Sequence, residues 1–161
     1  AWAAAAKLVE RGVDTERLYD AVYQQVEVGR PIGIRAALEN LEYHADGHLA
    51  VAWVADARLK ELGGALEDSD EVLDILRAVA QVEGVGFLTE REGGRVKVSF
   101  RSKRFLDVNK VARTIGGGGH ARAAGASFGE GVDLEQAIAK VRTALKEGYA
   151  AQDVAASLAS A

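Results

Sequence analysis

Four consecutive glycines, residues 116–119, constrain the fold of this 161-residue chain more than any other stretch. They follow residues 108–115, whose apolar periodicity is typical of a short amphipathic helix. One glycine is enough to end a helix, because only glycine enters the left-handed backbone region without a steric penalty. Four glycines indicate either the close approach of another backbone or ligand, or amide groups turned toward an anion.

This glycine run (residues 116–119) lies in the one strongly basic part of an acidic chain. The formal net charge of −4 argues against a general nucleic-acid binder. Residues 95–122, however, contain eight basic residues against one acid, Asp107, so this segment carries +7 and the remainder −11. A basic segment around a glycine run favours an anionic ligand.

The hydrophobic pattern predicts a mixed α/β fold, with a small, partly antiparallel sheet flanked by helices and preceded by a helical connector. Two hairpins are indicated, over residues 41–54 with Asp46-Gly47 in the turn, and over residues 85–101. In the second hairpin, the last arm alternates core residues with a row of basic groups. A further strand is expected over 123–128, and helices over 2–11, 15–28, 31–41, 57–62, 70–80, 108–115 and 134–148. The expected caps are Asp14 or Thr15 for the second helix, Asp68 or Ser69 for the fifth, and Asp107 and Asp133 for the last two.

The same pattern divides the chain into three parts: a connector of three short helices (1–40), one domain (41–148) and a frayed, alanine-rich tail (149–161). The sequence contains no methionine, so we expect this chain to be a piece of a longer protein. It contains no cysteine and no apolar run of about 18 residues, so we expect a cytoplasmic protein without a membrane span.

Catalytic machinery is not predicted in this chain. His44 and His48 flank a hairpin turn, so they do not form the side-by-side pair of a helical metal site, and no cluster has metal-ligand spacing. Ser99 and Ser102 have no base nearby in the sequence, so no activated nucleophile is indicated there. We therefore expect no catalytic residue and no metal ligand here.

Phosphate recognition is the better hypothesis. The glycine run can expose backbone amides, His120 and Arg122 add side-chain donors, and Arg101 ends the basic-faced strand. The alternative is that the glycines only let a helix pack against a strand, and that Arg101 is a solvated charge. We favour that structural role for Lys103, Arg104 and Arg113. The run is neither a Walker A loop nor a Rossmann turn, because it follows a helix instead of opening one.

Residues 117–125, Gly-Gly-Gly-His-Ala-Arg-Ala-Ala-Gly, resemble the Gly-Gly-Gly-His-x-x-Ala-Ala-Gly signature of the DHH-associated C-terminal domain of DHH-family phosphoesterases. Residues 98–102 resemble the strand of that family that ends in Arg-Ser, and residues 107–110 resemble its helix start. The similarity covers about residues 41–148, which leaves residues 1–40 as the connector to a missing N-terminal catalytic DHH domain.

The resemblance implies the nanoRNase/oligoribonuclease type, which also dephosphorylates 3′-phosphoadenosine 5′-phosphate. The missing domain would hold two Mn²⁺ ions on Asp and His ligands, so this chain alone would be an inactive, substrate-binding portion with no cofactor of its own. The implied substrate-binding residues are Arg101 and His120 on phosphate, the backbone of Gly117, Gly118 and Gly119 on the nucleotide, and additionally Ser102 and Arg122, the latter at a variable position of the signature. Implied partners are short RNA or DNA oligonucleotides, phosphorylated nucleotides and the DHH domain itself, with no membrane; the full-length form could be a homodimer.

Three alternatives stay open at this point. The chain could be a non-catalytic nucleic-acid-binding module, since related domains accompany alanyl-tRNA synthetases. It could instead be a fragment of a RecJ-type exonuclease. It could also be a folded connector whose glycine run only packs.

Overall fold

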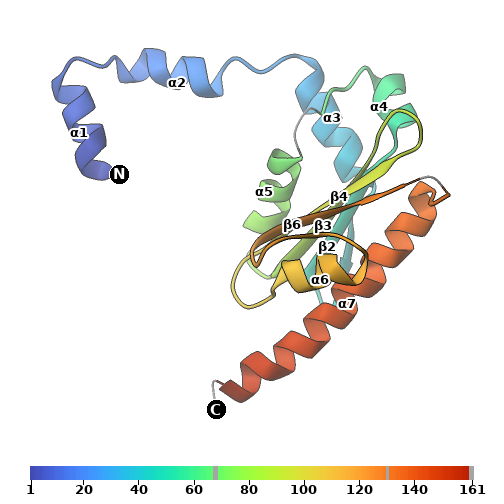
Figure 1. Ribbon diagram of the computed structural model, residues 1–161. Coiled ribbons are helices and arrows are strands. Elements are labelled where there is room, and N and C mark those ends of the chain that lie inside the picture. The colour runs from blue at the N-terminus through green and yellow to red at the C-terminus, as the bar shows by residue number, and fades with distance from the viewer. Residues whose placement is uncertain (67–68, 130, 160–161) are drawn as a thin grey trace.

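The computed structural model describes residues 1–66, 69–129 and 131–159, and these form a sheet with helices on both faces (Figure 1). The predicted mixed α/β fold class is confirmed. The elements follow the chain as α1 (Trp2–Glu10), α2 (Thr15–Tyr23), α3 (Gly29–Leu38), β1 (Glu42–His44), β2 (Leu49–Val54), α4 (Asp56–Leu62), α5 (Asp70–Ala78), β3 (Gly84–Glu90), β4 (Val96–Ser102), α6 (Val108–Thr114), β5 (Gly118–His120), β6 (Ala123–Phe128) and α7 (Leu134–Ala159).

The six-stranded sheet has the order β1-β2-β3-β4-β6-β5. Strands β2 and β3 are parallel, and every other neighbouring pair is antiparallel. Both predicted hairpins form, as β1–β2 and β3–β4, because each contains a turn sequence between alternating apolar residues. The third hairpin, β5–β6, was not predicted: part of the glycine run is itself an edge strand.

The two faces of the sheet bury two separate cores. On one face, α6 and α7 cover residues such as Leu49, Val98 and Phe100. On the other face, α3, α4 and α5 cover residues such as Ala52 and Phe87. Alternation divides the residues of β2 and β3 between the two cores, so that β2 is buried on both faces, whereas the buried apolar residues of β4 and β6 belong to the first core.

Helix α7 differs from the prediction that it ends at Gly148, because it continues to Ala159. A Cβ at Gly148 would lie 2.5 Å from Val111 Cγ2, so the glycine allows α6 and α7 to approach closely instead of ending the helix. The segment predicted as a frayed tail also makes contacts: Tyr149 stacks on His48 with ring centroids 5.7 Å apart, and Gln152 Oε1 accepts a hydrogen bond from the amide of Asp107 (2.8 Å).

The expected bounds of other helices shift by a few residues. Helix α2 ends at Tyr23, and α3 begins at Gly29, two residues before Pro31. Helix α5 ends at Ala78, two residues before the expected end at residue 80. Of its two proposed caps, Asp68 lies outside the described residues, and Ser69 takes the cap position without a side-chain hydrogen bond to the described part of the helix.

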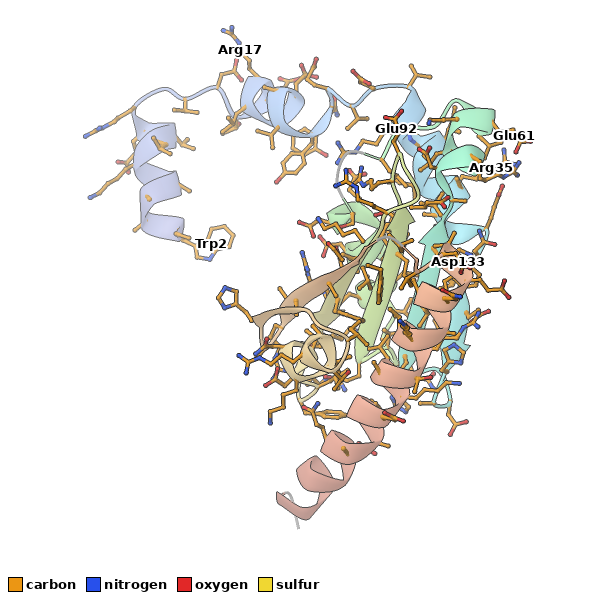
Figure 2. All side chains as sticks on the ribbon, turned by 45° about the vertical axis from the view of Figure 1, so that its right-hand side comes forward. Trp2, Arg17, Arg35, Glu61, Glu92 and Asp133 are labelled. Carbon is orange, nitrogen blue, oxygen red and sulfur yellow. The ribbon has the colours of Figure 1, made fainter. Side chains whose placement is uncertain are left out.

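Helices α1 and α2 extend away from the sheet and bury no residue (Figure 1). The Trp2 side chain, labelled in Figure 2 together with Arg17, is 91% exposed. Large apolar side chains of both helices, among them Leu8 and Leu18, are exposed as well. Across the described ranges, no helix has the length and apolar character needed to cross a membrane.

Candidate functional site

Helix α6 leads directly into the glycine run. Its predicted cap is confirmed, since Asp107 Oδ1 accepts hydrogen bonds from the amides of Asn109 (3.0 Å) and Lys110 (3.2 Å). Three buried side chains on its inner side attach the helix to the sheet: Val108, Val111 and Ala112. The start of the glycine run is therefore fixed in position.

Steric requirements of the fold explain three of the four glycines. Gly116 ends α6 with φ of +81°, in the region that glycine enters freely. A Cβ at Gly117 would lie 2.2 Å from the carbonyl oxygen of Gly125, and one at Gly119 would lie 2.6 Å from that of Ala123. At Gly118 the nearest atom to a Cβ would be 3.8 Å away, so nothing in the described structure requires glycine there.

The backbone amides of the glycine run are engaged inside the domain. The amides of Gly116 and Gly117 donate to the last carbonyls of α6, and the amide of Gly119 donates to Asn109 Oδ1 (3.0 Å). Because strand residues alternate, the amides of Gly118 and His120 then face β6, with which β5 pairs. The expectation of several amides turned toward an anion is therefore wrong for Gly116, Gly117 and Gly119.

The sheet register places Arg101 and His120 in one row. Arg101 on β4 and His120 on β5 are both opposite Ala123 on β6, so all three lie on the same face of the sheet. Two strand spacings of about 4.8 Å separate the two backbones by roughly 10 Å. The next row on this face contains Ser99, Gly125 and Gly118. Two of the predicted residues are thus brought together across three strands.

We call this surface the open face, and define it by the outward residues of β4, β6 and β5: Lys97, Arg101, Gly118, His120, Ala123, Gly125 and Ser127. Helix α5 contacts β3 and β4 and buries Ser99, but Gly118, His120 and Ser127 are exposed. The predicted row of basic groups on β4 is therefore interrupted where α5 covers the strand. In the part of the open face that α5 leaves uncovered, the residues between the basic side chains are small: Gly118, Ala123 and Gly125.

The two basic side chains of the row have different surroundings. The Arg101 side chain is 23% exposed; Nη1 donates to the carbonyl of Phe100 (3.0 Å), and Nη2 donates to the carboxylate of Asp70. The imidazole of His120 is exposed and makes no hydrogen bond or ion pair within the part of the chain that the structure describes. His120 is thus available to a ligand, whereas Arg101 already has an anionic partner.

Ser102 and Arg122 do not reach the open face. Ser102 is 3% exposed, and its hydroxyl donates to the carbonyl of Leu106 (2.6 Å), which also accepts from Arg122 Nη1 (2.8 Å). The amide of Ser102 donates to the carbonyl of Arg122 (3.2 Å), and that of Val108 to the carbonyl of Ala121 (2.9 Å). These bonds hold the turn between β5 and β6, which in turn orients His120.

Sequence reasoning missed a buried acid behind this turn. Glu83 is 2% exposed, and its Oε1 accepts from the amides of Arg104 (2.8 Å), Phe105 (2.8 Å) and Leu106 (3.1 Å). It thereby fixes the loop that ends at Leu106. A single acid next to the apolar run of β3 was the available signal. Asn109 was missed as well, although an amide side chain one residue into a helix can bond to a neighbouring loop.

Two other features do not add a catalytic centre. Within residues 1–66, 69–129 and 131–159, no group of three or more His, Cys, Asp or Glu side chains is placed to hold a metal ion. A groove of about 620 Å³ lies between the end of α6 and α7, lined by residues that include Thr114, Phe128 and Lys140. It is on the α7 side of the sheet, and its lining does not converge on one chemistry, so we place the candidate site on the open face.

Comparisons with known proteins match this chain to one family. The model of the DHHA1 domain family matches residues 46–147. The protein named bifunctional oligoribonuclease and PAP phosphatase NrnA of Thermus thermophilus is 37% identical over 144 residues, which are 89% of this chain and 42% of the relative. The protein of the same name from Bacillus subtilis is 24% identical over 144 residues, 89% of this chain and 44% of the relative.

A solved structure supports the same assignment. An exopolyphosphatase-related protein from Bacteroides fragilis superposes with a TM-score of 0.78 at 25% identity, over 90% of this chain and 42% of that chain. This chain therefore spans less than half the length of each of these three proteins. The family model covers most of the domain built around the sheet, including β2 to β6 and the glycine run. The chain belongs to the DHHA1 domain family, the DHH-associated domain of DHH-family phosphoesterases.

Proposed function

We propose that this chain is the substrate-binding portion of a phosphoesterase that hydrolyses short oligoribonucleotides and 3′-phosphoadenosine 5′-phosphate. The observation that carries the proposal is the row formed by Arg101, Ala123 and His120 on the open face. Arg101 and His120, whose side chains can donate hydrogen bonds to an anion, lie on either side of Ala123, whose methyl group is too small to obstruct a nucleotide. The names of the Thermus and Bacillus relatives supply the substrate class.

Each side chain has a distinct task in this proposal. The planar guanidinium of Arg101 can donate two parallel hydrogen bonds to phosphate oxygens. His120 donates one hydrogen bond, which becomes charge-assisted when the imidazole is protonated. At Gly118, the absent side chain leaves room for the nucleotide to approach the strand. Ser102 and Arg122 act behind this surface, by holding the β5–β6 turn.

The catalytic steps are assigned to another domain of the full-length protein. Two Mn²⁺ ions held there would supply an activated water. We assign residues 1–40 to the connector, because Leu18 and Val22 of α2 are more than half exposed and need an apolar surface to cover them. We also propose that the protein is cytoplasmic and that this chain alone does not hydrolyse a dinucleotide to mononucleotides with Mn²⁺ present.

The test is an NMR titration of this chain with the 5′-phosphorylated dinucleotide pApA. Replacing His120 by alanine should weaken binding about tenfold, the effect of losing one hydrogen bond to a charged group at a partly exposed site, and replacing Arg101, which donates two, should weaken it by at least as much. Arg113→Ala is the matched control, since Arg113 is an exposed cation at the end of α6 and lies outside the open face. Its affinity should equal that of the wild type.

Two outcomes contradict the proposal. If Arg101→Ala and His120→Ala bind pApA as the wild type does, the open face is not the phosphate site. If affinity instead rises steadily with RNA length and falls steeply with salt, the chain is a general nucleic-acid-binding module. The acidic net charge of −4 argues against that second outcome.

A further inference from the structure

The first residue of α5 stands beside the proposed phosphate site. Helix α5 packs on the sheet through three buried side chains, Val72, Leu73 and Leu76. At its start, the hydroxyl of Ser69 donates to that of Ser99 (3.2 Å), which lies in the row next to Arg101. Because this packing fixes the helix, the carboxylate of Asp70 is held at the edge of the open face.

Asp70 occupies one side of the guanidinium to which the proposed function assigns a phosphate. Arg101 Nη2 donates to Asp70 Oδ1, while Nη1 donates to the carbonyl of Phe100. The Asp70 side chain is 54% exposed, so water and dissolved anions reach this ion pair. One carboxylate oxygen therefore lies where an oxygen of an incoming phosphate would bind.

We infer that Asp70 is a built-in competitor that sets the affinity of the site. Its carboxylate holds Arg101 when no ligand is bound, and releases one edge of the guanidinium when a phosphate arrives. The inference rests on the proposed function, because it needs Arg101 to be the phosphate ligand.

The exchange is physically favourable in one direction. A partly exposed ion pair contributes little stability, because water and salt screen it. A phosphate that takes two hydrogen bonds from arginine is held more strongly than a carboxylate that takes one. The observed affinity is nevertheless reduced by the fraction of molecules in which Arg101 is free to change partner. Asp70 therefore keeps phosphate binding weak and favours release of the product.

The structure also allows the opposite role, in which Asp70 merely orients Arg101. The two roles predict opposite effects of removing the carboxylate. If Asp70 competes, its removal strengthens phosphate binding. If it orients, removal weakens binding, because Arg101 then loses its fixed position.

The experiment measures the affinity of four variants of this chain for pApA by NMR at constant ionic strength. Asp70→Asn and Asp70→Ala should each lower the dissociation constant about two- to fivefold, the range expected when a partly exposed ion pair no longer competes. The alanine variant is included because asparagine retains an oxygen that can accept from Arg101. Asp74→Asn is the matched control: it removes the same charge from the same helix, where Asp74 pairs with Arg77 at 2.8 Å, and should leave the affinity unchanged.

Arg101→Ala, the fourth variant, distinguishes the two possible failures. If it loses affinity while the Asp70 variants bind equally or more weakly than the wild type, the competitor role is overturned and the proposed function stands. If Arg101→Ala binds pApA as tightly as the wild type, both proposals are overturned. A gain in the Asp74 control equal to that in the Asp70 variants would reduce the effect to general charge, and would also overturn the inference.

Discussion

Alanine substitutions at Gly117 and Gly118, made one at a time, test two different reasons for a glycine. The fold requires glycine at position 117, whereas at position 118 the proposed nucleotide contact requires it. A methyl group at Gly117 would lie 2.2 Å from the carbonyl oxygen of Gly125 and 2.6 Å from Ala126 Cβ. At Gly118, the nearest atom, Asn109 Oδ1, would be 3.8 Å away, which is an ordinary contact. The two positions are adjacent, so they share every feature of local sequence and differ only in what surrounds them.

The geometry sets the expected magnitudes. Gly125 is part of β6, which is paired on both sides, so the clash at Gly117 is relieved only if the start of β5 moves away. Forcing an extra methyl group into such a contact costs about 1–3 kcal/mol. In a chain of this size, each kcal/mol lowers the melting temperature by about 2–4 °C, so Gly117→Ala should lower it by about 2–12 °C. Gly118→Ala should change the free energy of unfolding by less than about 0.5 kcal/mol.

Thermal and urea unfolding followed by circular dichroism measure the first effect, and pApA titration measures the second. We expect Gly118→Ala to unfold like the wild type but to bind pApA more weakly, because its methyl group would stand on the open face. If Gly117→Ala is as stable as the wild type, the close approach of residue 117 to β6 is wrong. If Gly118→Ala binds pApA with unchanged affinity, the nucleotide does not approach the strand at this point.

Two further predictions concern the support behind the site. Glu83→Ala removes the acceptor of three backbone amides and should lower the free energy of unfolding, measured in urea, by about 3 kcal/mol. Glu83→Gln keeps that acceptor oxygen and should lose less stability. Equal losses would contradict the role assigned to Glu83. Burial raises the pKa of Tyr149, and the carboxylates of Asp153, Glu83 and Asp46 add to this effect. The folded state therefore keeps the phenolic proton at a pH where the unfolded chain, whose tyrosine has a pKa of about 10, loses it. Stability should therefore fall as pH rises above about 10, and Tyr149→Phe should show a smaller drop in melting temperature between pH 9 and pH 11 than the wild type; an equal drop would contradict this.

Local sequence features predicted local structure well. Asp14 and Asp107 cap α2 and α6 through side-chain hydrogen bonds, as expected from an acid placed just before an apolar periodic segment. The Asp46-Gly47 turn joins β1 and β2, and both turn residues have positive φ. These features depend on neighbours within a few residues, which the sequence displays directly.

Contacts between distant segments decided the points that the sequence left unresolved. Gly148 was expected to end a helix, but its missing side chain accommodates Val111, 37 positions earlier in the chain. Ser102 was expected to contact substrate, but the carbonyl of Leu106 and the turn of another hairpin enclose it. The sequence does not show whether a glycine or serine is surrounded by solvent, by a ligand or by distant parts of the protein.

Strand pairing also explains how the glycine-rich signature contributes to the proposed anion site, although the amides of Gly116, Gly117 and Gly119 are bonded inside the domain. Gly117 and Gly119 allow the backbone to lie against β6, which makes residues 118–120 an edge strand. A turn of only two residues, Ala121 and Arg122, then sets His120 opposite Ala123, and β4 sets Arg101 opposite the same alanine. A shift of one residue in either pairing would move one of these basic side chains to the buried face. The glycines therefore serve the proposed site through register, by bringing to one surface two side chains that are 19 positions apart in the sequence.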